Sequence, residues 1–258
     1  MDDGIVRDGI KPGDVVVVTG AGGGFGRAFC KRFGRAGAKV AAWEVNAKAG
    51  EETVAQVKAA GGEARFFQVD LSDAAQIARA VEQTLAAFGA PYLVINNASI
   101  YPRAAVIDMK VEDWERTLKV NITAPFLIVR AFGPHMLKQK RGLVINIASG
   151  RGVEGAPRGA NYAASKAAIL SLTKTLALEW APHNVRVNAI IPGVSMTAQP
   201  LENTTPEELA ERGRREIPLG RVGYPDDMAG LAAFMASSDA AYMTGQAVAM
   251  NGGRVLVP

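Results

Sequence analysis

The chain has very few of the residues that build disulfide frameworks and metal centres. Its 258 residues include one cysteine and two histidines. A single cysteine excludes a disulfide framework, and Cys30 lies between Phe29 and Phe33 on an expected helix, which favours a buried thiol over a nucleophile. His135 and His183 lie outside every motif, in expected helix-to-strand connections, and no cluster of His, Cys, Asp or Glu has the spacing of metal ligands. The sequence therefore predicts that no metal is required.

Long apolar runs and blocks of one charge are also missing. No apolar run reaches the ~18 residues of a membrane-spanning helix, and the acidic start MDDGIVRDGIKPGD lacks the apolar stretch of a signal peptide. The 29 basic and 25 acidic residues give a formal charge of +4, and the basic residues are scattered without interleaved aromatic residues. We therefore expect a cytoplasmic protein that binds neither nucleic acid nor a membrane.

The composition that remains fits one folded unit. With 48% hydrophobic residues, the chain can bury about three quarters of the surface that its unfolded form exposes. The 13 prolines and 28 glycines are spread along the chain, and no linker, repeat or low-complexity run divides it. We expect a single domain over residues 1–258.

Short apolar strands alternate with segments of helical pattern. The apolar run from Val15 to Val18 precedes a glycine-rich turn, after which Phe25, Phe29 and Phe33 recur at helical spacing. Further strands are expected within KVAAWEV, ARFFQVD, PYLVINNA, GLVINIAS, NVRVNAIIPG and QAVAMNGG, and long helices within residues 73–89, 112–140 and 162–181. Such repeated units predict an α/β fold: a doubly wound Rossmann-type parallel sheet of about seven strands with helices on both faces. Ligands of such sheets bind at the carboxyl ends of the strands.

A dinucleotide site is expected after the first strand. Gly20, Gly24 and Gly26 are spaced as GxxxGxG between a strand and a helix, where the missing side chains let a helix N-terminus approach a pyrophosphate. The alternative is a glycine-rich loop that only turns the chain.

Acidic residues end the next two strands. Glu44 follows Gly20 by 24 residues, near the ~20-residue distance at which a carboxylate accepts hydrogen bonds from the adenosine ribose, so NAD is favoured over NADP. An ordinary exposed glutamate beside Lys48 is the alternative. Asp70 either binds the adenine amino group or caps the next turn. Asp73 is also suited to the capping role.

The segment YAASK places Tyr162 and Lys166 one helical turn apart, on the same side of an expected helix. An ammonium beside a phenol favours the phenolate, so we expect the pKa of Tyr162 to fall below its usual ~10. Ser149 stands 13 residues earlier, after the strand GLVINIA, where its hydroxyl could bond the same substrate oxygen. A tyrosine–lysine pair by itself is more often part of a solvated helix surface.

Together with NNAS at residues 96–99, these motifs closely resemble the short-chain dehydrogenase/reductase family over essentially all 258 residues. The resemblance implies that TGAGGGFG binds the pyrophosphate, that Asn96 to Ser99 stabilise the central strand and border the cofactor, and that PGVSMT contacts the nicotinamide carboxamide. Ser99 departs from the family, which usually has glycine there, and adds a side chain to backbone expected near the cofactor. The residues expected to bind the cofactor are Gly20, Gly24, Phe25, Gly26, Glu44, Asp70, Leu71, Asn97, Ala98, Ser99, Tyr162, Lys166, Pro192, Gly193, Val194 and Thr197.

The same resemblance implies four catalytic residues: Asn121, Ser149, Tyr162 and Lys166. Asn121 matches the asparagine that holds a water in a proton relay to the lysine, and the lysine also holds the nicotinamide ribose. Without the resemblance, Asn121 could merely break its helix and Thr197 could cap the next segment.

The expected function is hydride transfer between NAD(H) and a secondary alcohol or ketone, a small-molecule substrate. The alternatives are a 3-oxoacyl-[acyl-carrier-protein] reductase that uses NADPH, which Glu44 opposes, and a non-catalytic dinucleotide-binding regulator. The expected pocket comprises residues 100–103, 150–158 and 194–217, the last as a lid over substrate. Arg103, Arg151 and Arg158 could attract an anionic substrate, although exposed arginines are common.

The resemblance also implies a homotetramer, packed through the helices after Met109 and around Tyr162. The small residues Ala163, Ala164, Ala167 and Ala168 would permit close contact there, as they would inside a monomer. Substrate identity, stereospecificity and physiological direction do not follow from the sequence, because one fold and one catalytic set serve many chemistries.

Overall fold

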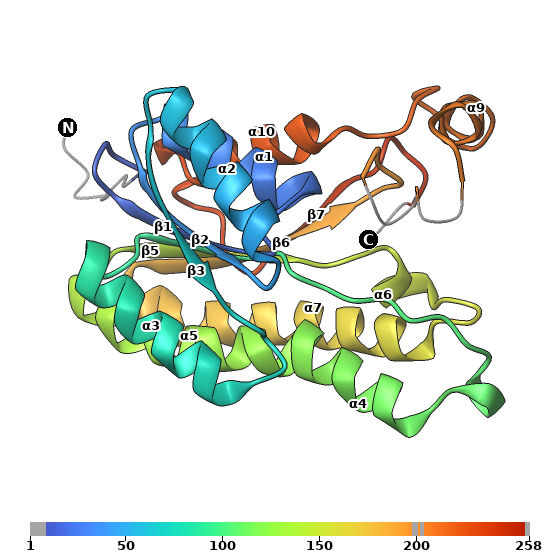
Figure 1. The fold of residues 1–258 in the computed structure, drawn as a ribbon, viewed down its shortest axis with the longest axis horizontal. Coiled ribbons are helices and arrows are strands. Elements are labelled where there is room, and N and C mark those ends of the chain that lie inside the picture. The colour runs from blue at the N-terminus through green and yellow to red at the C-terminus, as the bar shows by residue number, and fades with distance from the viewer. Residues whose placement is uncertain (1–8, 198–200, 202–203, 256–258) are drawn as a thin grey trace.

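The computed structural model describes residues 9–197, 201 and 204–255 (Figure 1). The described chain contains a seven-stranded parallel sheet in the order β3-β2-β1-β4-β5-β6-β7. The sheet order reverses beside β1, which pairs with β2 on one side and β4 on the other. The strands are β1 (Val15–Thr19), β2 (Lys39–Glu44), β3 (Glu63–Gln68), β4 (Leu93–Asn96), β5 (Gly142–Ile147), β6 (Val185–Pro192) and β7 (Ala247–Met250).

Helices cover both faces of this sheet. The helices are α1 (Gly24–Arg35), α2 (Ala47–Ala59), α3 (Ala74–Phe88), α4 (Val111–Leu118), α5 (Ala124–Gln139), α6 (Arg151–Glu154), α7 (Ala160–Trp180), α9 (Pro206–Glu216) and α10 (Pro225–Met235). Figure 1 shows α1, α2 and α10 on one face and α3, α5 and α7 on the other. The predicted doubly wound Rossmann-type fold is confirmed.

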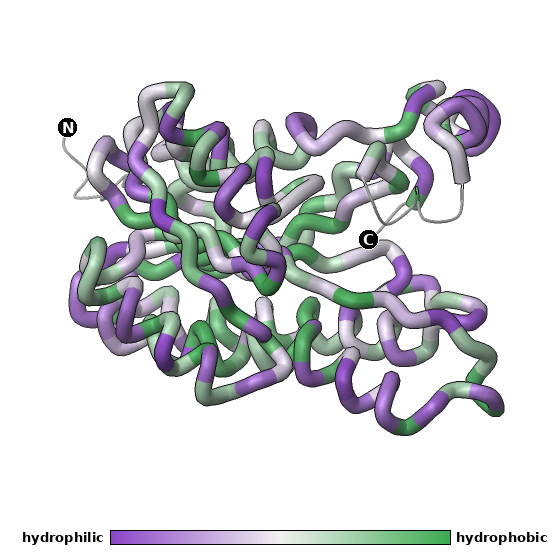
Figure 2. The backbone as a smooth tube through the Cα atoms, viewed as in Figure 1, coloured by the Kyte–Doolittle hydropathy of each residue, from purple (hydrophilic) through white to green (hydrophobic). Residues whose placement is uncertain are grey.

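The core consists of two apolar layers separated by the sheet. Val16 and Val18 pack in the layer of α1 and α10, whereas Val17 packs in the layer of α3 and α5, because alternate side chains of a strand point to opposite faces. Cys30 is buried in the first layer as predicted, and burial raises the pKa of its thiol to about 12. The apolar residues gather along the strands in Figure 2, whereas α9 is strongly hydrophilic.

The expected single helix over residues 112–140 is divided into three parts. Between α4 and α5, the residues Lys119–Thr123 form a π-helical turn. Such a turn adds a residue to the helix without ending it, so the helical pattern of the sequence continues across it. Within this turn lies Asn121.

The position predicted for His135 is wrong, because this residue lies inside α5. Pro134 does not end the helix: α5 continues to Gln139, with Phe132 and Met136 buried against the sheet. His183 does lie in a connection, the short 3-10 turn Ala181–His183 before β6. Within the residues that the structure describes, no helix is both long and apolar enough to cross a membrane.

Candidate active site

A cavity of about 1030 Å³ opens at the carboxyl ends of the strands, where the fold predicts a ligand. Each of the first six strands contributes to its wall, at or just beyond its last residue. These contributions are Gly20, Glu44, Asp70, Asn97, Ser149 and Pro192. Residues far apart in the sequence therefore line one continuous space.

The glycine-rich turn brings the start of α1 to this cavity. Gly20 has a φ of +64°, and a Cβ on it would lie 2.9 Å from the Cα of Ala98. A Cβ on Gly26 would overlap the carbonyl oxygen of Gly20. No side chain caps α1 among the described residues, and the space beside Gly23 is open. This uncapped N-terminus next to open space fits the pyrophosphate of a dinucleotide.

Glu44 has its carboxylate fixed at the cavity wall by three backbone groups. Its Oε2 accepts from the N–H of Gly22 at 2.9 Å, and its Oε1 accepts from the N–H groups of Val45 at 2.9 Å and Asn46 at 3.0 Å. The described contacts of Glu44 include no ion pair with Lys48, which is exposed on α2. The three hydrogen bonds therefore fix the orientation of the carboxylate at this end of the cavity.

Asp70 and Asp73 both bind the turn that follows β3. The Oδ1 of Asp70 accepts from the N–H of Ser72 at 2.8 Å and from its hydroxyl at 2.7 Å, while Asp73 caps α3. Asp70 thus has the capping role that the sequence offered, and it also lines the cavity beside Leu71.

The NNAS segment joins the central strands. The Nδ2 of Asn97 donates to the carbonyl oxygens of Thr19 at 2.9 Å and Gly20 at 3.2 Å, and the Nδ2 of Asn96 donates to the Oδ1 of Asn146 at 2.8 Å. Ser99 is exposed at the cavity wall. Its φ is not positive, so its side chain fits the loop without backbone strain.

The segment after β6 meets the glycine turn from the other side. Pro192, Gly193, Val194 and Thr197 all line the cavity, as predicted for the PGVSMT motif. A Cβ on Gly24 would lie 3.3 Å from the Cγ2 of Thr197. The glycine turn, expected at the pyrophosphate, and the PGVSMT segment, expected at the nicotinamide carboxamide, thus lie next to each other.

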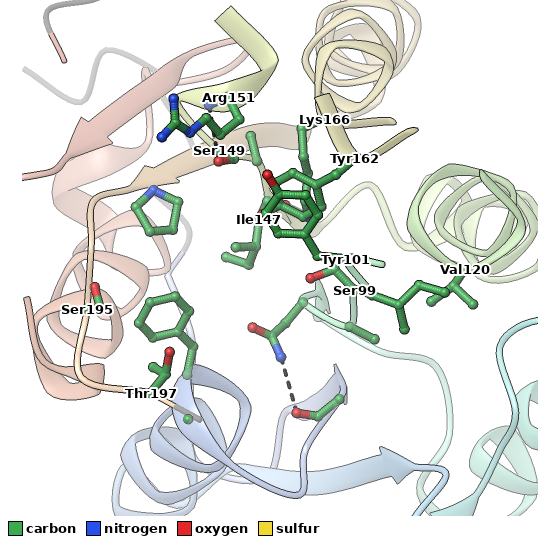
Figure 3. Close-up of a pocket in the computed structure, with 18 of the residues that line it drawn as sticks. Ser99, Tyr101, Val120, Ile147, Ser149, Arg151, Tyr162, Lys166, Ser195 and Thr197 are labelled. Carbon is green, nitrogen blue, oxygen red and sulfur yellow. Dashed lines mark hydrogen bonds between the residues drawn. The ribbon is translucent and has the colours of Figure 1, made fainter. Parts of the chain in front are cut away.

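Tyr162, Ser149 and Lys166 converge on one side of the cavity (Figure 3). Tyr162 is 8% exposed, and the side chain of Ser149 lies close enough to its hydroxyl to lower the pKa of the phenol. The Oγ of Ser149 accepts from the N–H of Arg151 at 3.2 Å. Lys166 is 2% exposed; its Nζ donates to the carbonyl oxygen of Ile147 at 2.7 Å and lies 5.5 Å from the centroid of the Tyr162 ring.

The pKa shift predicted for Tyr162 has the wrong sign. Burial raises the pKa of the phenol, and the hydrogen bond from Ser149 and the charge of Arg151 oppose this only in part. The Lys166 ammonium bonds a carbonyl instead of the phenol, and burial lowers its own pKa to about 8. Sequence spacing placed the two groups on one side of the helix but could not show which acceptor the ammonium bonds.

Asn121 holds the loop that follows β4. Its Oδ1 accepts from the N–H of Ile100 at 2.9 Å, and its Nδ2 donates to the carbonyl oxygen of Ile100 at 3.0 Å and to the Oγ of Ser165 at 3.0 Å. The side chain of Asn121 is buried, and the neighbouring Val120 lines the cavity. Asn121 therefore links α7, which carries Tyr162 and Lys166, to the loop after β4, so it does more than interrupt its helix.

Comparison with known proteins agrees with this geometry. A family model described as enoyl-(acyl carrier protein) reductase, of the short-chain dehydrogenase/reductase type, matches residues 20–254. The chain belongs to the short-chain dehydrogenase/reductase family. A 3-oxoacyl-[acyl-carrier-protein] reductase from Thermotoga maritima is 36% identical over 244 residues, covering 95% of this chain and 98% of the relative.

Two solved structures are also similar. One, from Beutenbergia cavernae, is of a protein provisionally assigned as an NAD(P)-dependent gluconate 5-dehydrogenase, with NADP bound at low occupancy; its TM-score is 0.88 at 39% identity, covering 94% of this chain and 97% of its own. The other is an NAD⁺-bound xylitol dehydrogenase, with a TM-score of 0.86 at 33% identity, covering 94% and 99%. This short-chain dehydrogenase/reductase is an oxidoreductase that transfers a hydride between a nicotinamide dinucleotide and an alcohol or ketone.

One aromatic contact of this dehydrogenase/reductase site has no signal in the sequence. Tyr101 stacks on Tyr162 with ring centroids 4.2 Å apart and an interplanar angle of 20°. Its neighbour Pro102 accepts at its carbonyl oxygen from the Nδ2 of Asn161, and Gly159 leaves the space that the Tyr101 ring fills. Tyr101 lies in the pocket range expected from the sequence, but only the fold shows that it covers the proposed catalytic tyrosine.

The remaining pocket residues agree in part with the expected ranges. Lining residues come from all three ranges, but Arg158 is not among them. Outside those ranges, the cavity is also lined by Asp113, Arg116, Val120, Arg254 and Val255. Within the part of the chain that the structure describes, no group of three or more His, Cys, Asp or Glu residues could hold a metal ion.

Proposed function

We propose that this enzyme uses NAD and oxidises a secondary alcohol or reduces the matching ketone. The observation that supports NAD is the Glu44 carboxylate, which three backbone N–H groups hold at the cavity wall. A carboxylate there accepts hydrogen bonds from ribose hydroxyls and repels the 2′-phosphate of NADP. Arg27, a nearby basic residue, is already bonded to Thr53 at 2.9 Å and paired with Glu52 at 3.4 Å, so it offers little compensation.

The proposed chemistry belongs to the residues around Tyr162. The nicotinamide ring, when bound, gives or accepts the hydride. Tyr162 exchanges a proton with the substrate oxygen, and the Ser149 hydroxyl stabilises the charge that develops there. A raised pKa keeps Tyr162 protonated and able to donate at neutral pH.

Lys166 and Asn121 have supporting roles in this proposal. Lys166 uses one N–H on the carbonyl oxygen of Ile147, which leaves two for the nicotinamide ribose and for a water on the way to the phenol. Asn121 fixes the loop from Ile100 and, as its family position implies, holds that water.

A second candidate is a 3-oxoacyl-[acyl-carrier-protein] reductase that uses NADPH. The similarity to the Thermotoga maritima reductase favours it, and the fixed Glu44 carboxylate opposes it. A non-catalytic regulator is opposed by the joint presence of Ser149, Tyr162 and Lys166 in one cavity.

The test is a substrate panel measured with both cofactors. Secondary alcohols, polyols, steroids and β-hydroxy thioesters are offered with NAD and with NADP, and reduced cofactor is followed by its absorbance. We expect turnover of a secondary alcohol with a strong preference for NAD. Turnover of thioesters alone, with NADP, would support the second candidate instead. Cofactor binding without any turnover would reject the enzymatic proposal.

Residues 194–217 are proposed to cover the substrate. Thr197, Thr204 and Arg212 line the cavity, and Leu209 anchors α9 on an apolar cluster with Ile217. Parts of the expected lid, residues 198–200 and 202–203, lie outside the described residues.

A homotetramer and a cytoplasmic location are also part of the proposal. On α7, Ala164 and Ala167 are exposed and Leu178 is 81% exposed, and on α5 Phe126 is 47% exposed. Exposed apolar side chains on neighbouring helices are typical of subunit interfaces. The unpaired, buried Cys30 fits a reducing compartment.

A further inference from the structure

We propose that the substrate carries an anionic group, a carboxylate or a phosphate, and that Arg151, with Arg103 and Arg254, recognises it. This inference rests on the proposed function, because it concerns the substrate of that same site. Charged side chains are unevenly distributed along the cavity wall. The arginines that line the cavity are Arg103, Arg116, Arg151, Arg212 and Arg254.

The arginines lie at the catalytic end of the cavity. They come from the loop after β4, from α4, from the start of α6, from α9 and from the chain after β7, the elements around Tyr162 and the segment after β6. The acidic residues that line this end are Asp113 and Glu154. Among the residues that the structure describes, five guanidinium groups and two carboxylates thus line this end, which leaves excess positive charge where a substrate must bind.

Internal ion pairs do not remove this excess. Glu216 is shared by Arg212 at 2.8 Å, Arg215 at 3.0 Å and Arg254 at 3.9 Å. The hydrogen bonds from Arg212 and Arg215 lower the pKa of Glu216 to about 2, so it supplies one negative charge to three positive ones. Arg254 has the longest of these contacts and is the one least committed to Glu216.

Arg151 and Arg103 have no acidic partner among the described residues. Arg103 lies over an aromatic ring, with its Cζ 4.7 Å from the centroid of Tyr101. Arg151 is half-buried at the cavity wall. Its guanidinium makes no hydrogen bond or ion pair with any residue that the structure describes. Two guanidinium groups at the substrate end therefore remain available for a ligand.

Arg151 is also tied to the catalytic residues. Its backbone N–H donates to Ser149, and its charge acts on Tyr162, lowering the pKa of the phenol against the effect of burial. Figure 3 shows Arg151 beside Ser149 at the edge of the cavity. An anion held by Arg151 would thus lie near the substrate oxygen that Ser149 and Tyr162 bind.

The expected effect follows from the strength of a charge-assisted hydrogen bond. Such a bond contributes about 1.5–3 kcal/mol, which corresponds to a factor of about 10 to 10² in kcat/KM. Exposed Arg103 and Arg116 add mainly long-range attraction, which salt weakens.

The experiment compares each anionic substrate with a neutral relative that has the same alcohol. The pairs are 3-hydroxybutyrate with its methyl ester, which tests a carboxylate, and glycerol 3-phosphate with glycerol, which tests a phosphate. For the anion that the site recognises, we expect kcat/KM to exceed that of its neutral partner by about 10-fold or more. The ratio should decrease as salt is raised from about 0.05 to 0.5 M.

Variants locate the effect at Arg151. Arg151→Gln should lower the charged-to-neutral ratio by about 10-fold, and Arg151→Lys, which keeps the charge, should lower it less. The matched control is Arg79→Gln, which removes one exposed positive charge from α3, outside the cavity wall, and should leave the ratio unchanged. The charged-to-neutral ratio of kcat/KM is used because an altered reactivity of Tyr162 would change kcat/KM equally for both substrates of a pair.

Two outcomes would overturn the inference. Equal kcat/KM for both members of each pair, or turnover of neutral alcohols from the wider panel without any turnover of the anions, would show that the site does not select an anion. Equal changes in Arg151→Gln and Arg79→Gln would reject the role of Arg151. Absence of turnover for every alcohol and ketone, with both cofactors, would instead reject the proposed function.

Discussion

The two ends of the cavity are lined by opposite charges and are fixed in different ways. At the end formed by β2 and β3, Glu44 and Asp70 line the wall, and no described lysine or arginine joins them there. At the other end, Tyr162 and Lys166 lie among the arginines that include Arg151. One end is suited to ribose and adenine groups, and the other to the proton transfer and the substrate.

The difference lies in which parts of the chain fix each end. The carboxylate of Glu44 is held by N–H groups of Val45 and Asn46, its own neighbours, and of Gly22. The phenol of Tyr162 is instead covered by Tyr101 and lies beside Ser149, which come from other segments. The end proposed to bind the cofactor ribose thus depends mostly on local backbone, whereas the end proposed to be catalytic depends on tertiary packing.

The largest effect is expected at the catalytic end, for Tyr162→Phe. The change removes the proton donor and keeps the ring that stacks on Tyr101, so turnover should fall by at least ~10²-fold while cofactor affinity stays nearly the same. Steady-state kinetics and cofactor titration measure the two quantities. Turnover near that of the wild type would show that another group transfers the proton.

At the other end, Glu44 should control the choice of cofactor. Two like charges at ~4 Å repel by about 4 kcal/mol at an effective dielectric near 20, and even part of this gives a preference of ~10²-fold for NAD. Glu44→Ala should lose NAD efficiency and bring the two cofactors close to equal use, as measured by kcat/KM for each. Glu44→Gln is the control that keeps the side-chain length and one acceptor oxygen while it removes the charge. Equal use of both cofactors by the wild type would remove this role from Glu44.

The buried Lys166 should reduce the stability of the cofactor-free fold. Its pKa is about 8 in the folded chain against 10.5 for an ordinary lysine, so between these values the unfolded chain binds more protons and the stability of the fold rises with pH. Lys166→Met should therefore raise the free energy of unfolding at pH 7, by about 2 kcal/mol, and this advantage should disappear as pH approaches 10.5. Urea denaturation at several pH values measures it. Lys174→Met, at an exposed position of the same helix, is the control; a gain for Lys166→Met that does not vary with pH would contradict the argument.

The stack over Tyr162 should have a smaller effect. Tyr101→Leu removes a ring contact of about 0.5–1.5 kcal/mol, and kcat/KM should decrease by about 3- to 10-fold. Because Tyr101 raises the pKa of Tyr162, the basic side of the pH–rate profile should also shift to lower pH. Tyr101→Phe keeps the stack, so kcat/KM should stay near that of the wild type, while loss of the Tyr101 hydroxyl should shift the pH profile in the same direction as in Tyr101→Leu. An unchanged pH profile in both variants would mean that Tyr101 acts on Tyr162 through packing alone.

The smallest effect is expected from chelators. In the proposed mechanism Tyr162 supplies the proton chemistry, and neither His135 nor His183 lines the cavity. Exhaustive treatment with EDTA should leave kcat and KM unchanged in standard assays. Inactivation that zinc or magnesium reverses would place a metal in the reaction.

The sequence placed the ends of buried strands better than it placed contacts between distant segments, for a physical reason. Buried parallel strands consist of nearly continuous apolar residues, so the ends of β2 and β5, and with them Glu44 and Ser149, could be located by inspection. The Glu44 carboxylate then bonds mainly to the N–H groups of its own neighbours Val45 and Asn46.

Contacts between distant segments could not be predicted in the same way. Lys166 and Tyr162 share a helix side by their spacing, yet the ammonium bonds Ile147 on β5, and burial of the phenol raises its pKa against the expected shift. The stack of Tyr101 on Tyr162 depends on how the loop after β4 meets α7. No local pattern carries that information.

The π-helical turn Lys119–Thr123 makes this part of the chain sensitive to its length. A π turn holds one residue more than an α turn, and each residue of an α-helix turns the chain by about 100°. Loss of a single residue here would let α4 and α5 merge into a regular helix, but it would rotate Asn121 away from Ile100 and release the loop that carries Tyr101. An insertion or deletion within this turn would therefore displace the loop that lines the cavity beside Tyr162.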